Sequence, residues 1–241
     1  MAQRASIERR STARYTLTVS SRRAATATKL EPTRARLDVE ERRRQLVALG
    51  HELFSARTYD EVSIDELARA AGISKGLLYH YFPTKRDFYI ATVREAAKQL
   101  LDRTETPPQM DPTERLVAGV DAWLEYVSHH GPAFISLLRS GIGADVEVAR
   151  IVDGTREAFL VRLLEEAPVD KPTPMMRVAL RGWVGLVESS AIEWLGSPNG
   201  VDRVELRNFF VQTLLSIVQS ATATASGAAA APGSRASSSG A

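Results

Sequence analysis

Two pairs of residues with distinctive chemistry stand at helical spacing in the first half of the chain. Lys75 and Tyr79 are four positions apart, and so are Gly76 and His80 beside them. Residues four apart on a helix lie one above the other, so a cation, a bare backbone site, a phenol and an imidazole would face outward together. Such a face suits the major groove of DNA, because charge binds phosphate or guanine and glycine permits close approach. The simpler alternative is a helical hairpin with an ordinary polar face.

The residues before this face predict a short helix and a tight turn. Ser63 is followed three positions later by Glu66, the spacing of a capping box, in which each side chain binds the other residue's backbone N–H. We therefore expect a helix from Ile64 to about Ala70. Gly72 would end this helix, because glycine adopts a positive φ without a Cβ penalty.

A second short helix is expected to carry the polar face itself. Ser74 is a suitable N-cap, and Pro83 would stop the helix. The inner face of this helix would consist of the apolar residues Ile73, Leu78 and Phe82. Two short helices joined at a glycine have the arrangement of a helix-turn-helix motif.

This unit closely resembles the signature of the TetR family of transcriptional regulators. The resemblance rests on the run G-I-S-K-G-L-L-Y-H-Y-F-P-T-K-R-D and extends over about residues 40–100. It implies an all-α chain with a small three-helix DNA-binding domain, whose helix-turn-helix motif spans about residues 63–82. A larger helical bundle for effector sensing and dimerisation would follow.

The resemblance also implies which residues contact DNA when the family's contacts are carried across by position. Base edges would be contacted by Lys75, Gly76 and Tyr79. Phosphates would be contacted by His80, Tyr81 and Lys85, with Ser63 or Ser74 assisting. This chain departs from the family at Leu77, where many members have threonine, so we expect a hydroxyl contact to the DNA backbone to be missing.

Two longer helices are expected on either side of the motif. Apolar residues at helical spacing predict the first over about residues 39–57. Thr84 and Asp87 repeat the cap spacing and predict the second from Lys85 to about Leu101. The first N–H groups of that helix, together with Lys85, would form a phosphate site. The same helix would connect the DNA-binding domain to the sensor domain.

Composition excludes several classes of protein. The 241 residues include no cysteine, which excludes disulfides and thiolate chemistry. No run of about 18 apolar residues predicts a membrane span, so no membrane partner is expected. The basic N-terminus is not followed by the apolar segment of a secretory signal. We therefore expect a cytoplasmic protein.

Charge is distributed unevenly along the chain. The first 36 residues hold nine Lys or Arg and two Asp or Glu, whereas the formal net charge of the chain is only +2. This polarity favours nucleic-acid binding at one end. We expect residues 1–37 to form a disordered basic arm, which either follows phosphates and a minor groove or is a solvated leader without a role. Residues 222–241 are expected to form a flexible tail.

A proline-rich segment around residues 104–112 predicts the boundary to a second domain. Residues 111–221 would form this effector-binding and dimerisation domain. Its helices are expected at about residues 113–129, 133–139, 146–166, 175–195 and 201–221, and no alternating strand pattern occurs.

The last two predicted helices have the composition of an interface. Apolar residues cover more than one stripe of each helix, and Gly182, Gly185 and Ser189 would allow close backbone approach. A homodimer would supply the second partner and match a palindromic operator on double-stranded DNA. The resemblance implies a four-helix dimer bundle here. The alternative is that both helices are central to the core of a monomer.

The second domain is also rich in aromatic and methionine residues, which line apolar cavities as well as cores. By resemblance, it should enclose a small effector, and the composition suits a largely apolar molecule such as a lipid, an acyl thioester or a drug. The expected wall residues are Trp123, Phe134 and Trp183. We expect Glu188 to face solvent or a neighbouring helix rather than the effector.

Little in the sequence supports catalysis, a metal or a cofactor, so we expect none of the three. His129 and His130 are adjacent and point to different sides, so they are expected to end a helix as cations. Two functions then remain. The first is a dimeric, sequence-specific repressor that an apolar effector releases from its operator. The second is an architectural or nucleoid-associated DNA-binding protein on the same scaffold, without ligand control.

Overall fold

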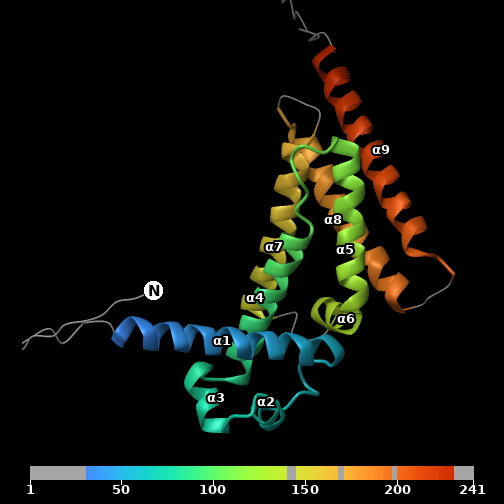
Figure 1. Ribbon diagram of the computed structural model, residues 1–241. Coiled ribbons are helices and arrows are strands. Elements are labelled where there is room, and N and C mark those ends of the chain that lie inside the picture. Colours follow the sequence, from blue (N-terminus) through green and yellow to red (C-terminus); the bar gives the residue numbers. More distant parts are fainter. Residues whose placement is uncertain (1–30, 140–144, 168–170, 197–199, 231–241) are drawn as a thin grey trace, which may run out of the picture. The chain divides into compact units, whose positions relative to one another are not determined.

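Helices make up all the regular structure in the described part of the computed structural model, which comprises residues 31–139, 145–167, 171–196 and 200–230 (Figure 1). The elements are, in order, α1 (Glu31–Ala56), α2 (Ile64–Ala70), α3 (Lys75–Tyr81), α4 (Lys85–Arg103), α5 (Pro112–His129), α6 (Gly131–Arg139), α7 (Val146–Glu165), α8 (Pro174–Gly196) and α9 (Arg203–Ala230). The all-α prediction is confirmed. None of the described helices combines the length and apolarity needed to cross a bilayer.

Local caps fix the ends of the short helices, as the sequence predicts. The Ser63 hydroxyl accepts from Glu66 N at 3.2 Å, and Glu66 Oε2 accepts from Ser63 N at 2.9 Å, so both halves of the capping box form. Gly72 has φ +64°, the left-handed conformation that favours glycine. The helix-turn-helix geometry therefore follows from residues within the motif itself.

The DNA-binding domain has a closed apolar core. Val62, Leu67, Leu78 and Phe82 are each at most 2% exposed, and they pack with residues of α1 and α4. Gly50 of α1 allows the closest approach: a Cβ at this position would lie 2.6 Å from the Phe88 ring of α4. The recognition helix therefore rests on a tightly filled base.

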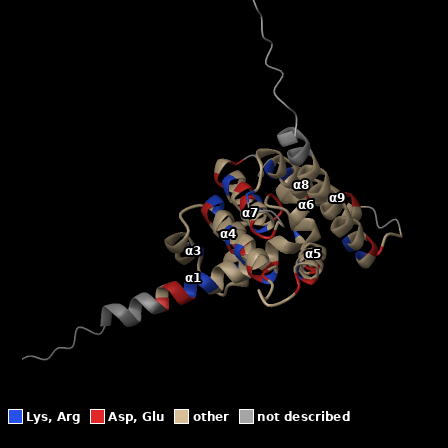
Figure 2. Cartoon of the chain, turned by 90° about the horizontal axis from the view of Figure 1, so that it is seen from above, with Lys and Arg blue, Asp and Glu red and all other residues tan. Residues whose placement is uncertain are grey.

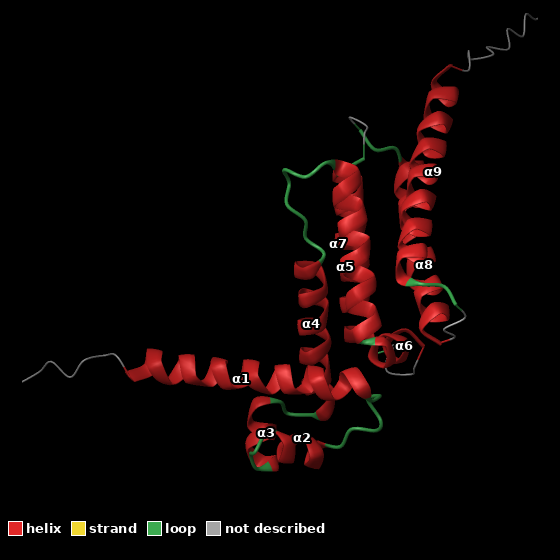
Figure 3. Cartoon of the chain, turned by 45° about the vertical axis from the view of Figure 1, so that its right-hand side comes forward, coloured by secondary structure: helices red, strands yellow, loops and turns green. Residues whose placement is uncertain are grey.

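A helical bundle forms the larger part of the structure. In Figures 1 and 3, α4, α5, α7, α8 and α9 run alongside one another, and contacts pair α4 with α7, α7 with α8, α8 with α9 and α5 with α9. Its core is built from Trp123, Leu124, Val127, Leu160, Met176, Leu180 and Phe210, together with their neighbours. Because α4 begins beside the DNA-binding motif and ends in the bundle, it links the two cores.

Two helix ends differ from the prediction by more than two residues. The first helix begins at Glu31 rather than near Val39, since the fixed φ of proline at position 32 suits a first helical turn. The last helix continues past Ala221 to Ala230, because its alanine-rich end has high helix propensity. The rest of the predicted arm, residues 1–30, and of the predicted tail, residues 231–241, lies outside the described residues.

Candidate nucleic-acid interface and ligand cavity

The recognition helix α3 separates an inner apolar side from an outer polar side. Leu78 is 1% exposed, whereas Tyr79 is 40% exposed and Leu77 41%. Lys75, Gly76 and His80 are exposed as well, so the four residues singled out at helical spacing do share a surface. Leu77 lies on the same exposed helix and presents methyl groups where a threonine would present a hydroxyl.

An acidic neighbour, Asp65, holds Lys75. Lys75 Nζ lies 3.1 Å from the carboxylate of Asp65 on α2, and both side chains are well exposed. Exposed ion pairs contribute little to stability, so Lys75 can exchange Asp65 for a phosphate or a guanine at small cost.

The two serines named as assisting contacts both serve as helix caps. The Ser63 hydroxyl donates to Glu66 Oε2 at 2.9 Å, so its proton is engaged within the capping box. The Ser74 hydroxyl accepts from Leu77 N at 3.1 Å, which leaves its proton for another acceptor. Of the two, Ser74 is therefore better placed to donate to a phosphate.

The residues expected at phosphates lie where α3 ends and α4 begins. The rings of His80 and Tyr81 meet edge to face with centroids 5.6 Å apart. Lys85 Nζ lies 4.1 Å above the ring of Tyr59, which keeps the cation close to the start of α4. Thr84 caps this helix by accepting from Asp87 N at 3.0 Å.

A salt bridge that sequence reasoning missed holds α2 in place. Arg57 Nη1 lies 3.0 Å from Glu66 Oε1. The Ser63 backbone N–H, and after it Arg57, lower the pKa of Glu66 to about 2. The capping box gives the position of the Glu66 carboxylate, but the loop that brings Arg57 to it leaves no local signal in the sequence.

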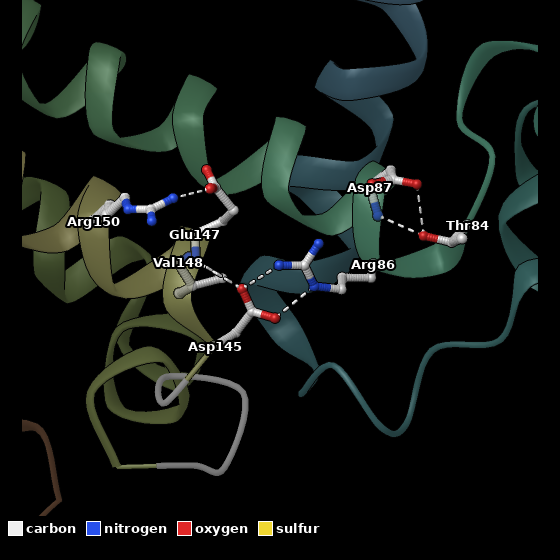
Figure 4. A network of polar contacts seen from close by, with 7 residues as sticks. All are labelled: Thr84, Arg86, Asp87, Asp145, Glu147, Val148 and Arg150. Atoms are coloured by element: carbon white, nitrogen blue, oxygen red, sulfur yellow. Dashed lines mark hydrogen bonds and ion pairs between the residues drawn. The ribbon is translucent and has the colours of Figure 1, made fainter.

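A second ion pair joins the start of α4 to the start of α7. Arg86 donates from Nε and Nη2 to the two carboxylate oxygens of Asp145 at 2.5 and 2.8 Å (Figure 4). Asp145 also caps α7 by accepting from Glu147 N at 2.9 Å. The Arg86 guanidinium is the main cause that lowers the pKa of the Asp145 carboxyl. One carboxylate thus fixes α7 to the residue next to Lys85.

The bundle contains a cavity of about 230 Å³ between α4, α5, α6, α7 and α8. Residues from Tyr89 of α4 to its C-cap Thr104 line one side, so the cavity follows about 20 Å of this helix at 1.5 Å per residue. The wall includes all three predicted residues, Trp123, Phe134 and Trp183. The Trp183 indole N–H donates to Phe210 O at 3.1 Å, so its polar atom is satisfied and its rings remain as apolar wall.

The charged side chains on the cavity wall are paired with each other or bound to the protein. Arg156 binds Glu188 through three contacts of 2.7 to 3.0 Å, and Arg115 lies 2.5 Å from Glu166. Arg162 donates to Leu101 O at 3.1 Å. The expectation that Glu188 has an interhelical partner is confirmed, because Arg156 lies on α7 and Glu188 on α8.

The wall of the cavity carries a polar cluster that sequence reasoning did not assemble. His51 Nε2 lies 3.2 Å from the Tyr126 hydroxyl, which donates to Ala96 O at 3.1 Å. The His130 ring meets Tyr126 and His51 edge to face, with centroid separations of 4.3 and 4.7 Å. The members of this cluster come from α1, α4 and α5, so no short stretch of sequence contains the signal.

His130 differs from its expected state. α5 ends at His129 as predicted, but burial, together with His51, lowers the pKa of His130 to about 4. His130 is therefore neutral at physiological pH and is not the cation expected at this helix end. In the described part of the chain, no group of three or more His, Asp or Glu side chains is arranged to hold a metal ion.

The outer side of α8 and α9 is apolar and uncovered. Met175, Val178, Val204 and Phe209 are between 49% and 67% exposed. A Cβ built on Gly182 or Gly185 would meet no atom within 4 Å. The charged residues of α9 lie in its first turns, and within this helix no Lys, Arg, Asp or Glu follows Arg207 (Figure 2).

Comparison with known proteins agrees with this arrangement. A family model described as "Bacterial regulatory proteins, tetR family" matches residues 46–92, and one described as "Tetracyclin repressor-like, C-terminal domain" matches residues 112–217. The HTH-type transcriptional activator FasR of Mycolicibacterium smegmatis is 27% identical over 172 residues, which are 70% of this chain and 78% of FasR.

Solved structures show the same relationship. A TetR-family transcriptional regulator from Streptomyces coelicolor is 37% identical, with a TM-score of 0.71 over 77% of this chain and 83% of that chain. FadR from Bacillus subtilis, crystallised in complex with stearoyl-CoA, is 19% identical and shares the fold, with a TM-score of 0.58 over 72% of this chain and 97% of that one. This chain belongs to the TetR family, whose members are DNA-binding transcriptional regulators and not enzymes.

Proposed function

We propose that this regulator is a homodimeric repressor that binds a palindromic operator and is released from it by a small, largely apolar effector. The observation that carries the proposal is the long cavity in the bundle. Its walls are mainly apolar, and its charged groups are already paired, so an apolar molecule can enter without stranding a buried charge. The alternative is an architectural DNA-binding protein without ligand control.

The chemical class of the effector follows from the shape and lining of the cavity. A narrow space about 20 Å long fits an extended chain better than a sugar or a nucleotide base. FadR of Bacillus subtilis, which shares this fold, was crystallised with stearoyl-CoA, and this supports a lipid-like effector. Trp123, Phe134 and Trp183 would contact it.

The cavity shares residues with the DNA-binding domain, which gives a route for release. Phe54 of α1 and Tyr89 of α4 belong to the apolar core beneath α3, and both also line the cavity. An effector that fills the cavity would displace these side chains or the helices that carry them. Because packed cores resist continuous deformation, a shift of α4 would move α3 with it.

The uncovered faces of α8 and α9 support the homodimer. Four large apolar side chains more than 48% exposed, beside two glycines with open space above them, form a patch that water would otherwise contact. A two-fold axis through this patch would bury it against its own copy. The same axis would present two α3 helices to successive turns of a palindromic site.

At the DNA, Lys75, Gly76 and Tyr79 would contact base edges, and His80, Tyr81, Lys85 and Ser74 would contact phosphates. Ser63 would assist only if its hydroxyl turned away from Glu66, to which it now donates. The exposed Leu77 would reach a thymine methyl group or the sugar edge of the groove.

Gel-shift titrations with operator DNA test the proposed DNA contacts of α3 and Lys85. Tyr79→Ala should weaken operator binding by roughly 1–3 kcal/mol and relax sequence preference, because a base contact is lost. Lys85→Ala should weaken binding to all sequences and lower the slope of log K against log salt, because a phosphate contact is lost. Unchanged affinity in both variants would contradict the assignment.

The same titration with fatty alcohols, fatty acids and acyl thioesters tests ligand control. Release from the operator together with a rise in Tm is the expected result. An architectural protein would instead stay bound and show no Tm change. Transcription from a promoter that contains the operator decides the sign of regulation, which matters because the relative FasR is named an activator.

A further inference from the structure

We propose that the effector carries one uncharged hydrogen-bonding end group, of the hydroxyl type, and binds with this end at the cluster of His51, Tyr126 and His130. The inference rests on the proposed ligand control and adds the orientation and end-group chemistry of the ligand. It places the polar end beside α1 and the apolar body along α4.

The hydrogen bonds of the cluster determine which ring nitrogen of His51 carries the hydrogen. The Tyr126 hydroxyl has one proton and donates it to Ala96 O at 3.1 Å. His51 Nε2, at 3.2 Å from the same oxygen, must therefore carry its own hydrogen and donate it to Tyr126. In a neutral imidazole this leaves Nδ1 of His51 as an acceptor.

His130 is the group on the cavity wall with unmet hydrogen-bonding capacity. Neither of its ring nitrogens takes part in a hydrogen bond with the described residues, and Nδ1 is shielded from solvent. A buried polar atom without a partner is costly, and native structures rarely retain one without a reason. Because Nδ1 is covered on the cavity side as well, Nε2 is the His130 nitrogen that a ligand group at this wall would bind.

The surroundings favour an uncharged group. Burial lowers the pKa of both His51 and His130, so both rings are neutral at physiological pH. The charged groups that act on them are Glu52, Glu95 and Arg103, His129 being the other titratable neighbour, and the Arg103 guanidinium lies over the Tyr126 ring at 5.6 Å. A hydroxyl both donates and accepts, which matches one imidazole acceptor and one imidazole N–H. A carboxylate could only accept, so it would match the imidazole N–H and leave the imidazole acceptor without a partner.

The two acidic side chains along the cavity do not compete for this end group. Glu188 already receives three contacts from Arg156, and Glu166 is bound by Arg115. A ligand that turned the other way would leave its hydroxyl beside saturated ion pairs. Because His51 lies on α1, an end group bound here would also touch the DNA-binding domain directly.

The test compares octanol, octane and octanoate binding to the full-length protein, followed by the fluorescence of the wall residues Trp123 and Trp183. We expect octanol to bind about tenfold more tightly than octane, the value of roughly one buried hydrogen bond. Octanoate should bind more weakly than octanol at neutral pH. His130→Phe and Tyr126→Phe should each reduce the octanol preference to about twofold or less, while octane binding persists and reports an intact cavity.

The matched control is His129→Phe, the same chemical change on the exposed neighbour that does not line the cavity. This variant should keep the full preference for octanol. Equal binding of octanol and octane by the wild type, tighter binding of octanoate, or a preference that survives in both cluster variants overturns the inference alone. If no ligand of any end group changes the fluorescence or the Tm, ligand control itself is wrong and the inference fails with it.

Discussion

The DNA-binding domain and the bundle above it are filled in opposite ways. Beneath α3 the core is closed, with Val62, Leu78 and Phe82 between 0% and 2% exposed. In the bundle, by contrast, about 230 Å³ remains between helices that are otherwise well packed. A closely packed core fixes the position of a recognition helix. Side chains around a cavity lack some of the apolar contacts of a filled core, and a ligand can supply these contacts.

The outer surfaces of the two regions differ in polarity. The exposed side of α3 carries a cation, a phenol and an imidazole, which suit a charged and polar partner. The exposed side of α8 and α9 carries Val178 at 67% and Phe209 at 52%, which suit a second apolar surface. The difference is the one that the proposed function requires, with DNA as the partner of α3 and a second copy of the bundle as the partner of α8 and α9.

The largest expected effect is a difference between the two regions in how far a Leu→Ala substitution lowers the free energy of unfolding. Leu67→Ala in the closed core should lower the free energy of unfolding by about 2–5 kcal/mol, because it creates a new void. Leu163→Ala on the cavity wall should cost clearly less, because this half-buried leucine already faces empty space. Urea unfolding of both variants measures the difference.

Addition of a ligand sharpens this comparison. Octanol at saturation should stabilise the wild type more than Leu163→Ala, while Leu67→Ala should gain as much as the wild type does. Equal costs for the two truncations without ligand would show that the cavity closes in solution, and the contrast between solid and hollow regions would then be wrong.

The second comparison adds a methyl group instead of removing one. Gly50→Ala should destabilise the protein by about 1–3 kcal/mol, because the new Cβ would lie 2.6 Å from the Phe88 ring and 2.7 Å from Thr92 Oγ1. Gly154→Ala on α7 is the control, since a Cβ there meets nothing within 4 Å. It should stabilise the helix by up to about 1 kcal/mol. Thermal unfolding followed by circular dichroism separates the two signs, and a stable Gly50→Ala variant would contradict the tight α1–α4 contact.

The sequence predicts the solid region better than the hollow one, for a physical reason. The ends of α2, α3 and the start of α4 depend on Ser63, Gly72, Ser74 and Thr84, whose caps act within three residues. Such contacts can be read from spacing alone. The alanine-rich end of α9 was not predicted as helix. Its low-complexity sequence suggested a flexible tail, although alanine favours helix.

The cavity depends on residues that are distant in the sequence. Composition suggested Trp123, Phe134 and Trp183 as wall residues, and all three line the space, but whether they contact an effector stays a prediction. His51 and Tyr126 are 75 positions apart and meet only after α1, α4 and α5 have packed. The neutral state of His130 arises from that same burial, so the residue type alone indicated the wrong charge.

The third prediction concerns the ion pair between Arg86 and Asp145, which joins the start of α4 to the start of α7. Asp145→Asn removes the ion pair with Arg86 but keeps a side chain that caps α7 well, so it should lower Tm by less than Gly50→Ala does. Asp145→Ala also removes the cap and should lower Tm further. In Asp145→Asn, effector-induced release from the operator should become less complete, because α7 no longer moves with the start of α4. Gel shifts at saturating effector measure the fraction of DNA that is released. Full release would show that the ion pair between Arg86 and Asp145 contributes to stability alone.

The smallest expected effect lies on the DNA-reading surface itself. Asp65 holds Lys75 at 3.1 Å and would lie close to DNA phosphates when α3 is bound. Asp65→Asn should therefore tighten binding to operator and to unrelated DNA alike, by roughly two- to five-fold, since the competing charge is lost but no base contact is gained. Fluorescence anisotropy with both DNAs at several salt concentrations measures the change.

Asp102→Asn is the matched control, because it removes the same charge near the far end of α4. Seventeen residues separate Asp102 from Lys85 on this helix, a distance of about 25 Å, which exceeds a Debye length of about 10 Å at 0.1 M salt. Asp102→Asn should therefore leave affinity for both DNAs nearly unchanged. If the two variants tightened binding equally, net charge rather than the position of Asp65 beside Lys75 would control affinity, and the polar face of α3 would lose its special role.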